Sequence, residues 1–229
     1  MADLALDNPA HFASLANAIP SIDPRTGAHL HRAACLAHVV IDLVGLSQAD
    51  PLAERIRLAA RLQTLGKLAI PDAILDKPGP LSAEDWNTLR HHPRFAFELL
   101  RQVPSLEPAA AVVLGRYERW DGSGHPSGLA RDAIPWASRV LAIAGSIDAM
   151  ASSRPYRAAL SPSEVLLELQ RGRATQFDPG LVDQVLADPG QIEAILTDGC
   201  VHARGVSKLN LVPPTRLKDH DSTPWSVTG

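Results

Sequence analysis

Apolar residues recur every three or four positions along most of the chain, the spacing that places them on one face of a helix. In the segment 26–44 this face is formed by His29, Ala33, Leu36, Val40 and Leu43. No segment shows the strict alternation of a half-buried strand, and no repeat of fixed length is visible. The pattern therefore predicts an all-α fold, a single-domain helical bundle.

Caps and prolines mark where the predicted helices begin and end. Ser82 and Asp85 resemble a capping box, and Ser47 is placed to cap the helix that follows it. A short leading helix is predicted between Asn8 and Pro20. Further helices are predicted near residues 82–90, 93–102, 105–118, 134–151, 162–171 and 179–188, with a turn-rich connection over 70–80.

These patterns divide the chain into three parts. Residues 1–24 are predicted to form an N-terminal helical lead, and residues 25–198 the helical domain. With 229 residues and 45% hydrophobic side chains, the chain can bury one substantial core. Beyond Gly199 the periodicity stops and prolines and scattered charges follow, which favours an irregular or flexible tail over residues 199–229.

Charge and cysteine content narrow the function classes. The formal net charge of −3 gives no basic footprint for a nucleic-acid polymer. No apolar run reaches membrane-spanning length, and the first residues carry Asp3 and Asp7 where a signal peptide needs positive charge. Cys35 and Cys200 are expected to be reduced thiols. We therefore expect a cytoplasmic protein with no membrane and no nucleic-acid partner.

Several short motifs occur in a specific order. Gly66-Lys67 and His92-Pro93 are followed by the run Trp-Asp-Gly-Ser-Gly-His-Pro-Ser-Gly-Leu over 120–129, and then by Arg-Pro-Tyr-Arg over 154–157. Together these motifs resemble the HD-GYP family, the metal-dependent phosphodiesterases of cyclic di-GMP. The resemblance covers roughly residues 25–187 and implies a bacterial signalling protein.

The resemblance also implies which metal ligands should be present. Active members of the family resemble enzymes with two or three metal ions held by His and carboxylate ligands, and such ions generate the hydroxide that attacks the phosphodiester. Only two histidines match ligand positions, His29 and His92. Other residues occupy five expected ligand positions: Gln63, Thr64, Arg116, Tyr117 and Gly145. Two imidazoles cannot hold such a centre, so the resemblance implies a degenerate domain and a pseudoenzyme, without metal, cofactor or catalytic residue.

Basic residues could still bind phosphate in this domain. Lys67, Arg154 and Arg157 match family positions that approach the dinucleotide, and Arg25 and Arg116 could add charge to the same cavity. Cyclic di-GMP or a related nucleotide would then be the ligand. These residues also have structural alternatives. The arginines of 154–157 could pair with an acid such as Asp148, and Lys67 could be a solvated turn residue. His29, one of the two remaining ligand positions, could be a core histidine.

The glycine-rich loop offers a different function. In the family this motif resembles a docking surface for partners such as diguanylate cyclase domains, and its equivalents here are Trp120, Gly122, Gly124, His125, Pro126 and Gly128. Protein interaction through this loop is the first hypothesis, nucleotide sensing the second, and residual metal-dependent phosphodiesterase activity the third. The simplest alternative is that the loop only helps the domain to fold.

Overall fold

The structure is a computed structural model that describes residues 24–153 and 158–198, with side chains from residue 31 onward. The predicted leading helix and the predicted tail lie outside these residues. The described part is helical, which confirms the predicted all-α class. Its β structure is limited to one isolated bridge between Arg173 and Phe177.

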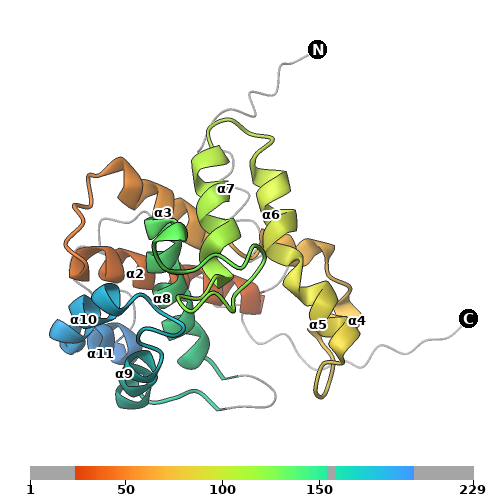
Figure 1. Cartoon of the computed structure of the whole chain (residues 1–229). Helices are drawn as coiled ribbons and strands as arrows, with labels where there is room; N and C mark the ends of the chain where they lie inside the picture. The colour runs from red at the N-terminus through yellow and green to blue at the C-terminus, as the bar shows by residue number, and fades with distance from the viewer. Residues whose placement is uncertain (1–23, 154–157, 199–229) are drawn as a thin grey trace, which may run out of the picture.

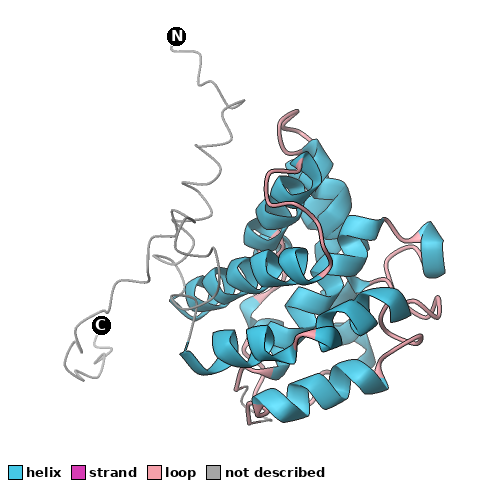
Figure 2. Cartoon of the chain, turned by 90° about the vertical axis from the view of Figure 1, so that its left-hand side faces the viewer, coloured by secondary structure: helices cyan, strands magenta, loops and turns pink. Residues whose placement is uncertain are grey.

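Helices follow one another through short connections (Figure 1, Figure 2). The α-helices are α2 (Pro24–Leu43), α3 (Pro51–Leu62), α4 (Asp72–Leu75), α5 (Ala83–Arg90), α6 (His92–Leu100), α7 (Glu107–Leu114), α8 (Trp136–Met150), α9 (Pro162–Arg171), α10 (Pro179–Ala187) and α11 (Pro189–Asp198). Three 3-10 turns join them: η1 (Leu65–Ala69), η2 (Gly115–Tyr117) and η3 (Arg131–Ala133).

Helices α2 and α8 form the centre of the bundle. α2 packs against α3 and α8, α7 packs against α3, α6 and α8, and α9 to α11 complete the opposite side. Many of the fully buried contact residues are alanines, among them Ala37, Ala59, Ala110 and Ala144. Small side chains let helix backbones approach closely, so the axes of this core lie near one another. Helices α4 and α5 instead extend away from the body and bury no residue (Figure 1).

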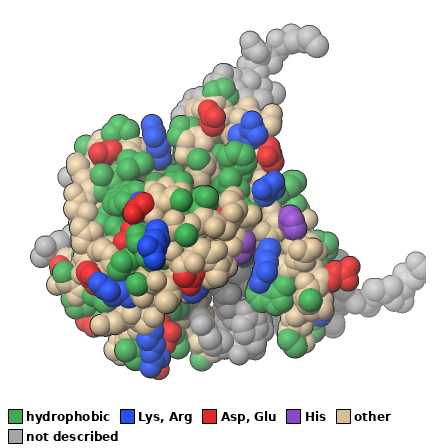
Figure 3. Space-filling model, in the orientation of Figure 1, with side chains coloured by type: hydrophobic (Ala, Val, Ile, Leu, Met, Phe, Trp, Pro, Cys, Tyr) green, Lys and Arg blue, Asp and Glu red, His purple; other side chains and the backbone are tan. Residues whose placement is uncertain are grey.

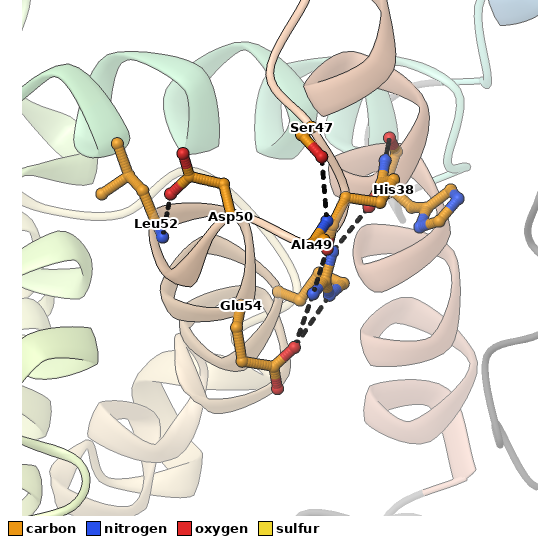
Figure 4. A network of polar contacts seen from close by, with 8 residues as sticks. His38, Ser47, Ala49, Asp50, Leu52 and Glu54 are labelled. Carbon is orange, nitrogen blue, oxygen red and sulfur yellow. Dashed lines mark hydrogen bonds and ion pairs between the residues drawn. The ribbon is translucent and has the colours of Figure 1, made fainter.

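The connection between α2 and α3 corrects one predicted cap. Asp50, not Ser47, caps α3: its carboxylate accepts a 2.7 Å hydrogen bond from the Leu52 amide (Figure 4). Ser47 lies in the preceding turn, where its hydroxyl accepts from the Ala49 amide. Proline at the first position of α3 makes Asp50 the better cap, because the fixed φ of Pro51 starts the helix directly after it.

The predicted capping box of α5 is confirmed. The Ser82 hydroxyl accepts from the Asp85 amide, and the Asp85 carboxylate accepts from the Ser82 amide at 2.8 Å. Lys77 also pairs with Asp85, which ties the preceding turn to the helix start. Reciprocal bonds of this kind satisfy amides that a free helix end leaves unpaired.

Two helices were not predicted. The connection over 70–80 contains the single turn α4, and α11 follows α10 directly. The sequence Asp188-Pro189-Gly190 is typical of a turn, yet Pro189 is the first residue of α11, whose buried residues are Ile192 and Ile195. Packing of α11 against α2 and α9 stabilises a helix that its own sequence marks only weakly.

Cys35 corrects a second expectation. It is wholly buried in α2 and is disulfide-bonded, so the expected reduced thiol is wrong at this position. Cys200 lies outside the described residues. None of the helices in the described part has the length and apolar character needed to cross a bilayer.

Candidate functional site

Residues from four elements meet where η1 and η2 pack against α6 and α8. His92 is the first residue of α6, Arg116 and Tyr117 lie in η2, and Gly145 is in the middle of α8. η1 contacts α6, and η2 contacts both α6 and α8. With Lys67 of η1, the fold thus brings together residues that are up to 78 positions apart in the sequence. Four of the positions that the resemblance assigns to metal ligands lie in this region.

The guanidinium of Arg116 occupies the space where a side chain of residue 145 would lie. A Cβ atom built on Gly145 would lie 2.5 Å from the Arg116 Nη2 atom and 3.2 Å from its Cζ. Gly145 is buried, and its lack of a side chain leaves room for the guanidinium. The two replacements are therefore linked, because the arginine at 116 uses the space that an acidic side chain at 145 would need.

Aromatic rings hold Arg116 from the other side. Its guanidinium lies 4.3 Å from the centre of the Tyr117 ring, a cation–π contact. Tyr117 in turn stacks on His125, with ring centres 5.1 Å apart and planes 9° apart. His92 meets the edge of the Tyr117 ring. These contacts restrict where the guanidinium can move.

Hydrogen bonds orient the His92 ring. Its Nδ1 lies 2.6 Å from the Leu89 carbonyl oxygen, which can only accept, so Nδ1 carries the proton. Nε2 then accepts from the Tyr117 hydroxyl at 3.2 Å. Burial is the main reason that the pKa of His92 falls to about 4; the Leu89 hydrogen bond opposes this shift, and the nearby cations Arg116 and Lys67 add to it. His92 is therefore neutral near pH 7.

This low pKa predicts that stability falls as the solution is acidified. The unfolded His92 binds a proton near pH 6.5 and the folded one only near pH 4, so the folded state loses stability between these values. Between pH 7 and pH 5 this histidine should cost about 2 kcal/mol of unfolding free energy. His31 and His125, whose pKa values burial also lowers, act in the same direction. Urea unfolding at both pH values measures the total.

Two substitutions isolate the contribution of His92. His92→Gln should flatten the pH dependence by about that amount, because glutamine does not titrate. Arg94→Gln, at an exposed position of the same helix, should leave the pH dependence unchanged, because it removes no histidine. An equal pH dependence in wild type and His92→Gln would show that His92 does not resist protonation.

The residues present do not fit a two-metal centre. A cation already lies beside Gly145, and Gln63 and Thr64 are buried at the C-terminal end of α3 with Gln63 Oε1 and Thr64 Oγ1 lacking hydrogen-bond partners. Within the described residues no group of three His, Cys, Asp or Glu side chains is placed to hold a metal ion. A guanidinium in the place of a ligand repels a divalent cation. Gln63 faces inward, as the helical spacing predicts.

The other predicted site residues are only partly placed. Lys67 lies in η1, half-buried, and close enough to lower the pKa of His92. The structure does not describe the side chains of Arg25 and His29. Arg154 and Arg157 lie outside the described residues. Asp148, which the sequence offered as their partner, receives a 2.8 Å hydrogen bond from the Arg32 Nε atom. Lys67 and Arg116 are thus the predicted phosphate contacts that the structure brings together.

A buried carboxylate organises the glycine-rich loop. Glu118 is 4% exposed, and its two oxygens accept from the amides of Ser127 at 2.7 Å and Leu129 at 3.0 Å. The backbone of Trp120 and Asp121 is bonded to the segment before α10, through the carbonyls of Gln176 and Thr175. The sequence analysis assigned no role to Glu118. Its position directly before a glycine-rich loop, whose backbone amides need acceptors, could have indicated this role.

The residues of the predicted docking loop differ in how far they are exposed. Trp120 and His125 are half-buried: Arg139 lies 5.6 Å from the Trp120 ring centre, and His125 stacks on Tyr117. Gly122, Gly124 and Pro126 are half-buried too, and Gly128 is exposed. The remaining exposed positions of the loop and its end are Asp121, Ser123, Ser127 and Ala130. The His125 ring therefore lies against the Tyr117 ring and is only partly accessible.

Positive charge gathers near this region. Arg90 and His91, at the junction of α5 and α6, lower the pKa of His125, after the larger effect of burial. In the space-filling view, histidine and Lys or Arg side chains gather where α5 and α6 meet (Figure 3). The face around η2 is thus more basic than the net charge of −3 suggests.

Comparison with known proteins identifies the fold and family. The profile described as "HD domain" matches residues 2–181. The chain belongs to the HD domain family. A relative of this HD domain is "Cyclic di-GMP phosphodiesterase response regulator RpfG" of Xanthomonas campestris, 40% identical over 79% of the chain and 48% of the relative. "3'3'-cGAMP-specific phosphodiesterase 2" of Vibrio cholerae is 34% identical over 81% of the chain and 36% of the relative.

Solved structures agree on the fold. A cyclic GMP-AMP specific phosphodiesterase of V. cholerae, V-cGAP3, superposes with a TM-score of 0.56 at 18% identity, over 78% of the chain and 48% of that protein. Bd1817, an "HDG"Y"P" protein of Bdellovibrio bacteriovorus, gives a TM-score of 0.54 at 16% identity over 73% of the chain and 51% of that protein. The resemblance to the HD-GYP family is confirmed. This HD domain spans about half or less of the length of these relatives.

Proposed function

We propose that this HD domain acts in a cyclic di-GMP-related pathway by binding, without hydrolysing cyclic di-GMP. The observation that carries the proposal is the Arg116 guanidinium beside Gly145, where the resemblance assigns metal ligands. Without a metal-bound hydroxide, nothing near His92 supplies a nucleophile at neutral pH. The curated relatives are named as cyclic dinucleotide phosphodiesterases, which supports the pathway but not the activity.

Protein interaction through the glycine-rich loop is the binding function that we propose first. The Glu118 carboxylate fixes the backbone at Ser127 and Leu129, and Ser127 and Ala130 point to solvent. A fixed loop loses little conformational entropy when a partner binds. The loop keeps this architecture while the residues expected to bind metal are replaced. The proposed partner is a diguanylate cyclase domain, in line with the resemblance.

Substitution of the exposed loop residues tests this proposal. Ser127→Arg combined with Ala130→Arg should weaken binding to a purified diguanylate cyclase domain at least tenfold, because two large charged side chains would block the surface. Thermal stability should change little, since both side chains are exposed. Titration calorimetry measures the affinity, and a thermal melt measures the stability.

A matched pair of substitutions serves as the control. Gln184→Arg with Ala187→Arg adds the same charge to exposed positions of α10 and should leave binding unchanged. Equal affinity of the wild type and the loop variant would reject the loop as the docking surface. Failure of the wild type to bind any of the diguanylate cyclase domains encoded in the same genome would reject this partner.

Nucleotide binding is the second candidate function. Arg116 and Lys67 form a basic region next to the neutral His92, and this is the observation that favours it. Arg25, Arg154 and Arg157 remain proposed contributors from outside the description. Residual phosphodiesterase activity, the third hypothesis, would need metal ligands other than the residues that meet around Arg116.

A further inference from the structure

Arg116 is a cation without a counter-ion in the described part of the chain. No carboxylate there forms an ion pair with it, and its Nε atom is buried without a hydrogen-bond partner. An unpaired buried N–H of a charged group costs free energy, and an anion or water that reaches it removes that cost. The Arg116 Nε–H group is therefore available to donate a hydrogen bond to a ligand.

The acids of the surrounding elements are engaged elsewhere. Glu118, two residues along the chain, accepts from the amides of Ser127 and Leu129. Asp148, one turn beyond Gly145 in α8, is bonded to Arg32. Lys67 adds a second cation in η1, and His92 is neutral. Within the described residues, no carboxylate thus forms an ion pair with Arg116 itself.

The position of the guanidinium is fixed before any ligand arrives. Gly145 provides the space on one side, and the Tyr117 ring covers the other at 4.3 Å. The Tyr117 ring is itself held by His92 and His125. A planar guanidinium held in one orientation can offer two parallel N–H groups to the two oxygens of a phosphate.

We propose that Arg116 replaces the metal ions as the cation that holds a phosphate group, so that this HD domain binds phosphodiester nucleotides without metal. The inference rests on the proposed absence of hydrolysis and adds the contact that binds the ligand. Arginine holds charge at any physiological pH but does not generate hydroxide, so the phosphodiester is retained intact. The chemical class is a phosphate oxyanion, carried by a cyclic dinucleotide, its linear form or inorganic phosphate.

Titration calorimetry in the presence of excess EDTA tests the proposal. Cyclic di-GMP, linear pGpG and inorganic phosphate are titrated separately into the full chain. Wild type should bind at least one of them. Arg116→Met should weaken binding at least tenfold, and Gly145→Asp should do the same by placing a carboxylate beside the retained arginine. The most tightly bound probe names the source of the phosphate.

Two further variants make the result decisive. Arg116→Lys keeps the charge but loses the two-pronged geometry and should bind at an intermediate level. Arg55→Met removes an exposed arginine of α3 and should bind as wild type does. Circular dichroism establishes that each variant is folded. If Arg116→Met does not fold, Gly145→Asp and Arg116→Lys decide the outcome.

Failure of the inference differs from failure of the proposed function. Binding in EDTA that is equal in wild type, Arg116→Met and Gly145→Asp would overturn the role of Arg116 and leave the absence of hydrolysis standing. Binding that EDTA abolishes and manganese restores would overturn both, because a metal would then hold the phosphate. Absence of binding to all three probes would overturn the inference alone.

Discussion

Cyclic di-GMP incubated with this HD domain and added manganese or iron is expected to yield no linear dinucleotide or GMP above the level of buffer. Metal-dependent hydrolysis accelerates the reaction by at least about 10⁶-fold, and that acceleration requires a hydroxide bound to a metal. Arg116 lies where the side chain of residue 145 would be, and the Tyr117 hydroxyl bonds to His92. Chromatography of the nucleotides measures the products.

The assay needs a positive control and a metal analysis. One of the phosphodiesterase relatives, purified and assayed in the same way, should convert the substrate completely. The HD domain itself, purified without chelators, should contain less than one iron, manganese or zinc ion per chain. Product that increases in proportion to protein and disappears in His92→Ala would show that the domain is an active enzyme. Two bound metal ions per chain would contradict the expected absence of a metal centre.

A large loss of stability is expected for Gly66→Ala. A Cβ atom at this position would lie 1.9 Å from the His92 carbonyl oxygen and 3.2 Å from the Ala96 Cβ atom. The clash is with backbone, so η1 and α6 must move apart, which should cost about 3 kcal/mol or more. Urea unfolding followed by circular dichroism measures the change.

Gly190→Ala is the matched control for that substitution. Its Cβ atom would lie 3.7 Å from the nearest atom, the Asp188 Oδ1, which is an ordinary contact. Alanine favours a helix over glycine, so α11 should be unchanged or slightly more stable, within about 1 kcal/mol. Equal stability of Gly66→Ala and Gly190→Ala would show that η1 and α6 are not in close contact.

The contact at Gly66 also connects stability with the site. η1 carries Lys67, and α6 begins with His92, so their separation determines how closely these two side chains approach. A substitution that moves η1 should therefore change the surroundings of His92 as well. The glycine before Lys67 is required by this close approach, which the motif alone does not explain.

Local signals predicted much of the helical structure. The capping box at Ser82 and Asp85 and the helix over 162–171 are confirmed, because caps and apolar spacing act within one helix. The inward position of Gln63 is confirmed for the same reason. Predictions failed where packing stabilised a segment with turn-like sequence, as in α11, or where a stronger cap lay nearby, as at Asp50.

The candidate site could be predicted residue by residue but not as an arrangement. Alignment with family motifs identified Arg116 and Gly145 as separate substitutions. It also placed His125 in the docking loop, but it did not indicate that this ring stacks on Tyr117. Side-chain direction within a loop depends on the surfaces that the loop meets, and a sequence does not specify these.

The sequence by itself determined the helical class, the family motifs and the replacement of expected metal ligands, because each depends on residue type at short spacing. Only the tertiary structure decided that Arg116 fills the space beside Gly145, 29 positions away, and that Glu118 holds the glycine-rich loop. Contacts of this kind form when helices distant in sequence pack at van der Waals distance. They depend on where each helix lies in the fold, and the spacing of residues within one helix does not specify that position.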